Sequence, residues 1–392
     1  MSGMDEHLLP TYRKAEEVFV HGSGARLFDD KGHAFLDFIS GIGVSALGHA
    51  HPRLTAALHD QVGKLLHVSN LYRHGLTEDV AARIARLTGM EATFFCNSGS
   101  EAVEAAIKLA RKHQKVAGRQ ERSSILALEG SFHGRTTGAL AATSNAAYRD
   151  PFGPLLEVNF LANDDPEALV AALVGQQAAA LILEPIQGEG GLQPLSHEYL
   201  RAAREACTST QTVLIHDEIQ CGVGRTGRFL AADAAGVKPD LVCLAKPLAA
   251  GIPIAALVAN AELANTLGPG DHGSTFGGGP LALRAAQVVL DELEVGGLMM
   301  RVLERGQQLQ QGLQKLSDKC PFATGTRGVG LMQGLLVPGR SAELQRELHT
   351  RHLLSATATG DVLRLLPPYT VTTTDVDEAL SIISDALIAI ED

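Results

Sequence analysis

One lysine of this sequence lies in a segment that is unusually apolar for its side chain. Lys246 occurs in "DLVCLAKPLAAGIPIAAL" and is the only lysine between Lys238 and Lys315. A lysine that loses hydration has a lowered pKa, and its neutral amine can form a Schiff base with an aldehyde. Taken alone, the pattern is more typical of a strand-end lysine that extends to solvent. Its assignment therefore depends on the neighbouring groups.

An acid follows another apolar segment. In "TVLIHDEIQCGVGRTG", Asp217 stands at the C-terminal end of a predicted buried strand. Ligands of open parallel sheets bind beyond these strand ends, so the carboxylate could pair with a protonated ring nitrogen. Gln220 could donate a hydrogen bond to the same ligand. On its own, a solvated acid in a turn is the simpler explanation of Asp217.

A third segment could hold a phosphate group. The sequence "FFCNSGSEAVEAAIKLARKH" (residues 94–113) predicts a strand that ends at Cys96, a turn, and an amphipathic helix. The free N–H groups and small hydroxyls of Ser98–Ser100, at the start of this helix, suit one phosphate. The same residues also fit an ordinary capping box from Ser98 to Glu101 without a ligand.

The lysine, the acid and the phosphate cradle are together the three anchors that pyridoxal 5'-phosphate requires. Two glycine motifs, at residues 222–227 and 41–46, also match the dinucleotide pattern G-x-G-x-x-G/A. That pattern must lie directly between a strand and a helix, and residues 222–227 follow two acids that would repel a pyrophosphate. A nicotinamide-dependent oxidoreductase is therefore kept only as an alternative.

The composition narrows the class of protein. The 392 residues include 33 Lys and Arg against 44 Asp and Glu, which gives a net charge of −11, and 45% of them are hydrophobic. Such a chain forms a large core and about two to three domains. An acidic chain with 4% aromatic residues is a poor nucleic-acid binder. No apolar run approaches the ~20 residues of a membrane span.

The cysteines and the first residues indicate the compartment. Five cysteines are spread along the chain without a C-x-x-C pair, which is typical of reduced thiols and predicts neither a disulfide framework nor a metal site. The start "MSGMDEHLLPTYRKAEE" has no apolar core, so we expect no signal peptide. We therefore predict a cytoplasmic protein.

The elements that position these groups follow from hydrophobic periodicity. Residues 18–40 predict a small antiparallel meander. Short apolar runs then alternate with amphipathic helices at 53–66, 77–88 and 101–114; the runs are "ATFFCN", "SSILALE", "AALILEP", "TVLIHDE", "DLVCLAK" and "AALVAN". A long helical stretch runs from Pro280 to about Leu316, and the chain ends with the apolar run "DVLRLLPP" and a helix at 374–390.

This alternation predicts an α/β fold with a mainly parallel central sheet covered by helices. We assign residues 51–284 to a large cofactor-binding domain. Residues 1–50 and 285–392 are assigned to a smaller α+β domain that is built from both chain ends.

At this point the sequence resembles the fold-type I pyridoxal-phosphate aminotransferases that act on ω-amino groups, and among them the type that uses acetylornithine. The resemblance covers almost the whole chain. It rests on the ordered motifs "FISGIGVSALGHAHP" (38–52), "FFCNSGSEAVEAAIKLAR" (94–111), "SFHGRTTGAL" (131–140), "LILEPIQGEGGLQP" (181–194), "HDEIQCGVGRTG" (216–227), "LAKPLAAGIPIAAL" (244–257), "HGSTFGGGPLA" (272–282), "RGVGLMQG" (327–334) and "LRLLPP" (363–368).

The resemblance implies a role for each matching residue near the cofactor. Lys246 would hold the cofactor as a Schiff base and later move a proton between substrate and cofactor carbons. Asp217 would pair with the ring nitrogen, and Gln220 would contact the ring oxygen. The remaining cofactor contacts would be Gly99 and Ser100 at the phosphate, Phe132 against the ring, and Thr275 from the neighbouring subunit of a homodimer with shared active sites.

The resemblance also implies substrate contacts. Arg364 would bind the α-carboxylate of the amino acid or oxo acid, and Glu189 would pair with Arg364 in one half-reaction and release it in the other. Arg135 and Ser274 accompany acylated ornithine in the family. Without the resemblance, the simpler explanation of Arg135 and Arg364 would be a surface arginine. That of Glu189 would be an acid in a turn.

The implied reaction converts N-acetylornithine and 2-oxoglutarate to N-acetylglutamate 5-semialdehyde and glutamate, in arginine biosynthesis. Other ω-amines remain alternatives: ornithine, succinyl-diaminopimelate, γ-aminobutyrate, and a carrier-linked aminoadipate semialdehyde precursor of lysine biosynthesis. A non-catalytic regulator is a further alternative, although it would have no reason to keep Lys246, Asp217 and Arg364 together.

The sequence departs from the family pattern around the lysine. The family commonly has Lys-Gly-Leu-Gly-Gly-Gly, whereas this chain has Lys-Pro-Leu-Ala-Ala-Gly at 246–251, with Pro247, Ala249 and Ala250 at glycine positions. We therefore expect that this loop does not need positive φ at these positions. Gly279 replaces the usual Asn, and Ser100 replaces the usual Thr.

Overall fold

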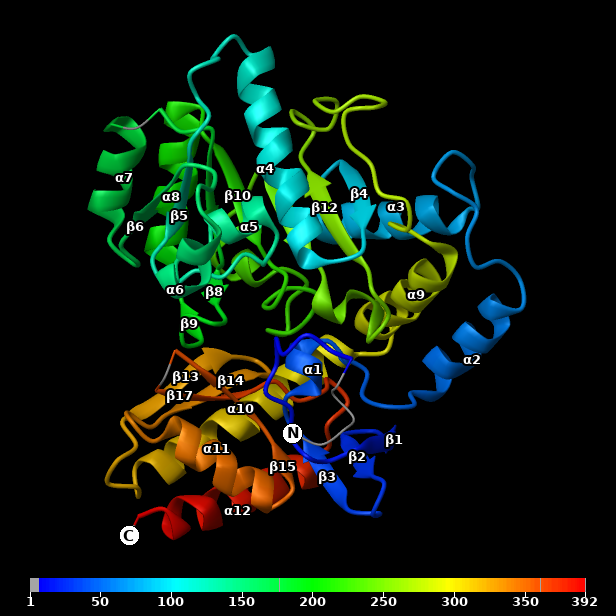
Figure 1. Cartoon of the computed structure of the whole chain (residues 1–392), viewed down its shortest axis with the longest axis vertical. Coiled ribbons are helices and arrows are strands. Elements are labelled where there is room, and N and C mark those ends of the chain that lie inside the picture. Colours follow the sequence, from blue (N-terminus) through cyan, green and yellow to red (C-terminus); the bar gives the residue numbers. More distant parts are fainter. Residues whose placement is uncertain (1–6, 176, 360, 392) are drawn as a thin grey trace.

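The chain folds into a large part and a smaller part that face each other (Figure 1). The computed structural model describes residues 7–175, 177–359 and 361–391. Residues 1–6, the start of the segment for which we expect no signal peptide, lie outside the described part. Among the described helices, none is both long and apolar enough to cross a bilayer.

A seven-stranded sheet forms the centre of the large part. In spatial order its strands are β4 (Ala92–Cys96), β12 (Ala255–Ala259), β11 (Leu241–Leu244), β10 (Val213–Asp217), β7 (Ala180–Leu183), β5 (Ile125–Leu128) and β6 (Val158–Leu161). Only β12 pairs antiparallel with its neighbours in this sheet, whereas the other pairings are parallel. The prediction of a mainly parallel α/β sheet is confirmed.

Helices cover both faces of this sheet because its strands carry apolar side chains on both sides. In β10, Ile215 packs into the core below α4, while Leu214 packs on the opposite face against α8. The helices of the large part are α2 (Pro52–Val62), α3 (Leu76–Thr88), α4 (Gly99–Val116), α5 (Thr137–Ala141), α6 (Ala146–Arg149), α7 (Pro166–Gly175), α8 (His197–Thr210) and α9 (Pro280–Glu294).

Both ends of the chain contribute to the smaller part. The predicted meander forms β1 (Phe19–Ser23), β2 (Arg26–Asp29) and β3 (Ala34–Asp37), and β15 (Leu353–Leu354) pairs with β3. A second sheet has the order β13 (Gly325–Val329), β14 (Met332–Leu336), β17 (Val362–Leu365) and β16 (Ala356–Ala358). The helices here are α10 (Leu298–Ser317), α11 (Ser341–Thr350) and α12 (Thr373–Ala389). The domain boundaries at 50/51 and 284/285 stay a prediction.

Two details differ from the sequence-based expectations, and a third concerns a segment for which no conformation was predicted. The helical stretch after Pro280 is interrupted before α10, where Gly297 has φ +67°. The strand β6 was not expected, because it is half-buried along its whole length and lies at the sheet edge, so it lacks a strongly apolar run. The segment 40–43 is a left-handed turn, with positive φ at all four residues.

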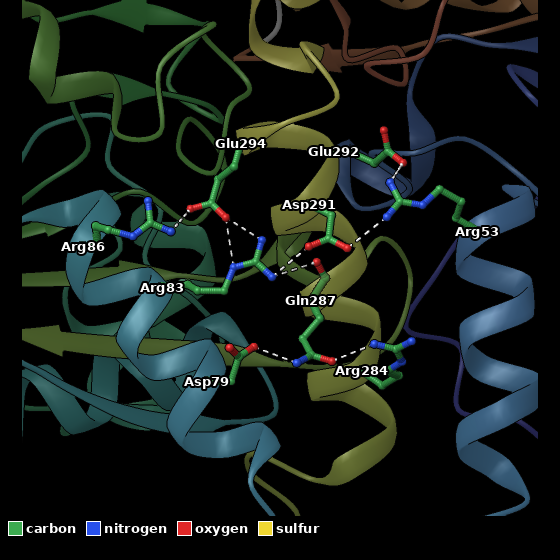
Figure 2. A network of polar contacts seen from close by, with 9 residues as sticks. All are labelled: Arg53, Asp79, Arg83, Arg86, Arg284, Gln287, Asp291, Glu292 and Glu294. Atoms are coloured by element: carbon green, nitrogen blue, oxygen red, sulfur yellow. Dashed lines mark hydrogen bonds and ion pairs between the residues drawn. The ribbon is translucent and has the colours of Figure 1, made fainter.

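A network of ion pairs joins α2 and α3 to the C-terminal end of α9 (Figure 2). The Arg83 guanidinium group lies 2.9 Å from Asp291 and 2.5 Å from Glu294, and its side chain is 16% exposed. Arg86 also contacts Glu294, but its side chain is 64% exposed. Since α9 leads from the large part into α10, these pairs fix the helix at the junction.

We expect Arg83→Ala to lower stability by about 1–2 kcal/mol, because it leaves two carboxylates without their main partner at a helix C-terminus. Arg86→Ala is the matched control and should cost less than about 0.5 kcal/mol, as exposed pairs do. Thermal unfolding of both variants measures the difference. Equal losses of stability in the two variants would contradict the claim that the more buried arginine contributes more.

Candidate active site

A cavity of about 310 Å³ lies at the carboxyl ends of the parallel strands. Its wall is formed by residues that follow five strands, namely β4, β5, β7, β10 and β11. Parallel strands bring their C-terminal ends to one edge of a sheet, which is why residues distant in sequence meet here. Seven of the predicted site residues line the cavity: Gly99, Ser100, Phe132, Glu189, Asp217, Gln220 and Lys246.

The start of α4 forms one end of the cavity. Ser98 caps the helix by accepting a hydrogen bond from the Glu101 N–H at 3.3 Å. In a capping box the Glu101 carboxylate would accept a hydrogen bond from the Ser98 N–H. Here it accepts one from the N–H of the preceding residue, Asn97, at 2.8 Å. The N–H groups and the positive dipole end of this 18-residue helix favour an anion at Gly99 and Ser100.

The Asp217 carboxylate is held in place at the end of β10. Its Oδ2 lies 2.7 Å from Nδ1 of His133, and its Oδ1 accepts a hydrogen bond from the Ile219 N–H at 3.0 Å. Since a carboxylate only accepts hydrogen bonds, Nδ1 carries the proton when Asp217 is ionised. Both side chains are buried, so the pair holds the Asp217 carboxylate at a defined point of the cavity wall.

Lys246 is separated from the end of β11 by Ala245 alone and begins a short 3-10 turn, Lys246–Ala249. Burial lowers the pKa of its amine, and the positive charge of Arg364 lowers that pKa further. Three carboxylates oppose this effect: Glu189, Asp217 and Glu184. The lowered pKa increases the fraction of neutral amine, which is the nucleophilic form.

The loop after Lys246 corrects one expectation. Ala250 has φ +47°, although we expected no positive φ at the substituted glycine positions. Lys246 itself has φ +21°. Such conformations are unfavourable for residues with a Cβ and persist where the surroundings hold them. Ala250 is held by a hydrogen bond from its N–H to the Pro247 carbonyl and by burial in the core.

Arg364 and Glu189 form the predicted ion pair. Nη1 of Arg364 lies 2.6 Å from Oε1 of Glu189 and 3.5 Å from Oε1 of Gln220. Arg364 comes from β17 of the smaller part, whereas Glu189 and Gln220 come from the large part. The Arg364 side chain is 3% exposed, while that of Glu189 is 35% exposed. Glu189 is therefore the partner that has room to move away.

Arg135 lies outside the residues that line the cavity. Its side chain is exposed, and its guanidinium group stacks over the Tyr148 ring at 3.8 Å and lies 5.5 Å from the centre of the Phe132 ring. Its backbone N–H donates to Oγ of Ser100. Arg135 therefore lies next to two cavity residues, Phe132 and Ser100, with its charge toward solvent.

Ser274 and Thr275 are likewise not part of the main cavity. Ser274 lines a neighbouring space of about 160 Å³, where its Oγ accepts hydrogen bonds from Asn97 Nδ2 and the Gly277 N–H, both at 3.1 Å. Thr275 is exposed. Within a single chain, neither residue lines the main cavity, although Ser274 contacts Asn97, which does.

Sequence reasoning missed three residues of the site. His133 was quoted only within a motif, Glu184 was given no role, and Val44 follows the left-handed turn and lines the cavity. Glu184 is 5% exposed, and burial raises its pKa to about 7, with Asp217 adding to the effect and His133 opposing it. Its position directly after the apolar run 180–183 was a usable signal, as it was for Asp217.

The glycine motif at residues 222–227 does not form a dinucleotide site. It forms a series of turns rather than the junction between a strand and a helix. Arg225 within it is fully buried and donates hydrogen bonds to the carbonyl groups of Leu331, Pro367 and Gly43. This segment therefore ties the two parts together and leaves no space for a pyrophosphate.

The residues of the cavity fit the chemistry of pyridoxal 5'-phosphate. The α4 N-terminus suits its phosphate, the Asp217–His133 pair suits a protonated ring nitrogen, and the Lys246 amine suits its aldehyde. Nε2 of His133 is buried and has no hydrogen-bond partner among the described residues. A polar atom beside Asp217 is therefore still able to form a hydrogen bond.

Comparison with known proteins agrees with this chemistry. The family model described as Aminotransferase class-III matches residues 11–387. A relative from Mesorhizobium japonicum, named acetylornithine aminotransferase, is 41% identical over 376 residues, which cover 95% of this chain and 94% of the relative.

Two solved structures are similar over nearly their whole length. The ornithine aminotransferase from Toxoplasma gondii, which holds pyridoxal phosphate at partial occupancy, has a TM-score of 0.94 at 34% identity and covers 98% of this chain and 93% of its own. The N-acetylornithine aminotransferase from Stenotrophomonas maltophilia has a TM-score of 0.85 at 34% identity, with 96% and 97% covered.

Proposed function

The chain belongs to the class-III aminotransferase family, whose members depend on pyridoxal phosphate, and from this premise we propose its substrates. We propose that it transfers the side-chain amino group of N-acetylornithine to 2-oxoglutarate, which gives N-acetylglutamate 5-semialdehyde and glutamate. The observation that carries the proposal is that Lys246, Asp217 and Glu189 line one cavity and that Arg364 pairs with Glu189. The proposed pathway is arginine biosynthesis.

In this proposal the chain's residues hold the cofactor at both ends. Gly99 and Ser100 bind its phosphate, with Thr275 of a second subunit completing the contact in a homodimer. Phe132 packs against the ring, Gln220 contacts the ring oxygen, and Asp217 keeps the ring nitrogen protonated. When bound, the cofactor withdraws electrons from the substrate carbon that loses a proton.

Lys246 has two tasks in the proposed reaction. Its neutral amine would hold the cofactor at its aldehyde carbon in the resting enzyme and would be freed when the substrate amine takes that place. The freed amine would then move a proton between the substrate and cofactor carbons as a general base and acid, for which a lowered pKa is favourable. The burial that lowers its pKa supports both tasks.

Arg364 and Glu189 would allow one site to accept two different substrates. The amino donor has its acylated end far from the reacting amine, and Glu189 then neutralises Arg364. The α-carboxylate of 2-oxoglutarate would displace Glu189 and form a bidentate pair with Arg364. The greater exposure of the Glu189 side chain supports this exchange.

The choice of acetylornithine rests on Arg135 and Ser274 and on the names of the relatives. Arg135 would bind the donor carboxylate, and Ser274 would contact the acylated end of the donor.

The five free cysteines are compatible with the proposed cytoplasmic location.

A comparison of donors tests the proposal. With 2-oxoglutarate as acceptor, we expect kcat/KM for acetylornithine to exceed those for ornithine, succinyl-diaminopimelate and γ-aminobutyrate by about tenfold or more. Arg135→Ala should raise KM for acetylornithine about 10- to 100-fold, because a charge-assisted contact is lost. Arg149→Ala is the matched control, since Arg149 is also stacked on an aromatic ring, that of Phe160 at 4.4 Å, but Phe160 does not line the cavity as the Arg135 contacts Phe132 and Ser100 do. A donor with a higher kcat/KM than acetylornithine would refute the proposed substrate. An unchanged KM in Arg135→Ala would refute the substrate-binding role of Arg135.

A further inference from the structure

Two loops of the large part meet at the wall of the cavity. The loop after β5 carries Phe132, and the loop after β8 (Ile186–Gln187) carries Glu189. The first side chain is proposed to pack against the cofactor, and the second pairs with Arg364. The relative position of these two loops therefore affects both cofactor binding and the exchange of substrates.

Glu184 bonds to both loops at once. Its Oε1 accepts a hydrogen bond from the Phe132 N–H at 2.9 Å, and its Oε2 accepts one from the Gly188 N–H at 3.0 Å. The carboxylate itself lines the cavity. Oε1 thus holds the backbone of Phe132 itself, and Oε2 holds the backbone of Gly188, the residue before Glu189.

The two bonds require a carboxylate of this length. Both partners are N–H donors, so each oxygen must accept, which an ionised carboxylate does and a carboxamide cannot do at both positions. The position is costly, since Glu184 is buried close to Asp217 and its pKa is raised to about 7. Buried ionisable groups with strongly shifted pKa values occur most often where the group has a task.

The same loops are also linked farther from the cavity. Nε2 of Gln187 donates to the Glu129 carbonyl at 2.8 Å, and Nδ2 of Asn163 donates to the same carbonyl. Because this outer link does not involve Glu184, the loops stay attached to each other when Glu184 is replaced. The contribution of Glu184 is therefore confined to the cavity end.

We propose that Glu184 is a positioning residue that couples the loop of Phe132 to the loop of Glu189, so that cofactor retention and oxo-acid binding depend on one carboxylate. The proposal rests on the proposed function for the identity of the oxo acid. It does not rest on that function for cofactor retention, which is measured without any substrate.

The chain offers a closely matched control in Glu218. This carboxylate is fully buried, accepts two backbone hydrogen bonds from Ala231 and Ala232 at 2.8 and 3.0 Å, and has a pKa raised to about 7. It lies one residue beyond Asp217 but does not line the cavity. Glu218→Gln therefore reproduces the general cost of losing such a carboxylate without touching the two loops.

The experiment compares Glu184→Gln, Glu184→Asp and Glu218→Gln with the wild-type holoenzyme. Pyridoxal phosphate affinity is measured by equilibrium dialysis of the apoenzymes, and the second half-reaction is measured with 2-oxoglutarate. We expect both Glu184 variants to bind the cofactor about tenfold more weakly, which corresponds to about 1.4 kcal/mol. We also expect them to lose about tenfold in kcat/KM for 2-oxoglutarate, mainly through KM.

Each outcome decides the proposal. Losses of both quantities in both Glu184 variants, with Glu218→Gln close to wild type, support it. A change in only one quantity, a normal Glu184→Asp variant, or equal losses in Glu218→Gln overturn it. If wild type binds the cofactor but does not use acetylornithine, the proposed donor fails while the dialysis result still tests Glu184. The milder Glu184→Asp variant serves if Glu184→Gln does not fold.

Discussion

Lys246→Ala yields a folded protein whose turnover is reduced by at least about 10⁴-fold, since the substitution removes both the nucleophile and the proton carrier. The backbone at this position already has an unfavourable φ of +21°, which alanine adopts no less readily than lysine. The loss is therefore chemical rather than structural. Steady-state assays with the donor and oxo acid measure it.

Reduction with borohydride followed by mass spectrometry adds a readout that is independent of turnover. In the wild type this treatment should attach the cofactor covalently to the peptide with Lys246, and in Lys246→Ala no attachment should be found. Lys246→Arg is a second variant, because arginine keeps the positive charge but never provides a neutral amine. Lys238→Ala is the control for loss of an exposed lysine. Appreciable activity in Lys246→Ala would refute the role given to this residue.

Asp217→Asn reduces kcat about 10³-fold while the protein still binds the cofactor. The amide oxygen of asparagine can accept the bond from His133, whereas its amide nitrogen cannot accept the bond from the Ile219 N–H, so one of the two bonds is kept and the negative charge is lost. Without that charge the ring nitrogen is no longer kept protonated, and the cofactor withdraws electrons less strongly. Lys246 and the start of α4 still hold the cofactor at its other two anchors.

Single-turnover rates and the cofactor content of the purified variant measure this prediction. Asp217→Glu, which keeps the charge on a longer side chain, is expected to recover part of the lost rate. A kcat of Asp217→Asn within about tenfold of wild type would contradict the assigned role. A variant without bound cofactor would show that Asp217 acts through binding instead.

Local sequence patterns predicted the features that depend on neighbours in the chain. The strands around Asp217 and Lys246 were predicted because continuous apolar runs are typical of a sheet that is buried on both faces. The start of α4 was predicted from its capping residue Ser98 and the periodicity that follows. For the same reason β6 was missed, since its residues 158–161 are only half-buried at the sheet edge.

Contacts between distant residues were not predictable in this way. His133 meets Asp217 across 84 positions, and Glu184 meets Phe132 across 52; no local pattern specifies either contact. The Arg364–Glu189 pair was named only because the sequence resembles a family. The positive φ of Ala250 also depends on tertiary packing, which overrides the preference of the residue.

The pairing between the two ends of the chain has a consequence for biosynthesis. Arg26 at the start of β2 donates hydrogen bonds to Glu378 in α12, which lies 352 residues later. At a synthesis rate of about 5–20 residues per second, roughly 20–70 s pass between the synthesis of β2 and that of its partner helix α12. During this interval the edge of the first strands and the exposed side chains of Phe19 and Val20 are open to chaperones and to other nascent chains. The smaller part is thus completed only after α12 has been synthesised.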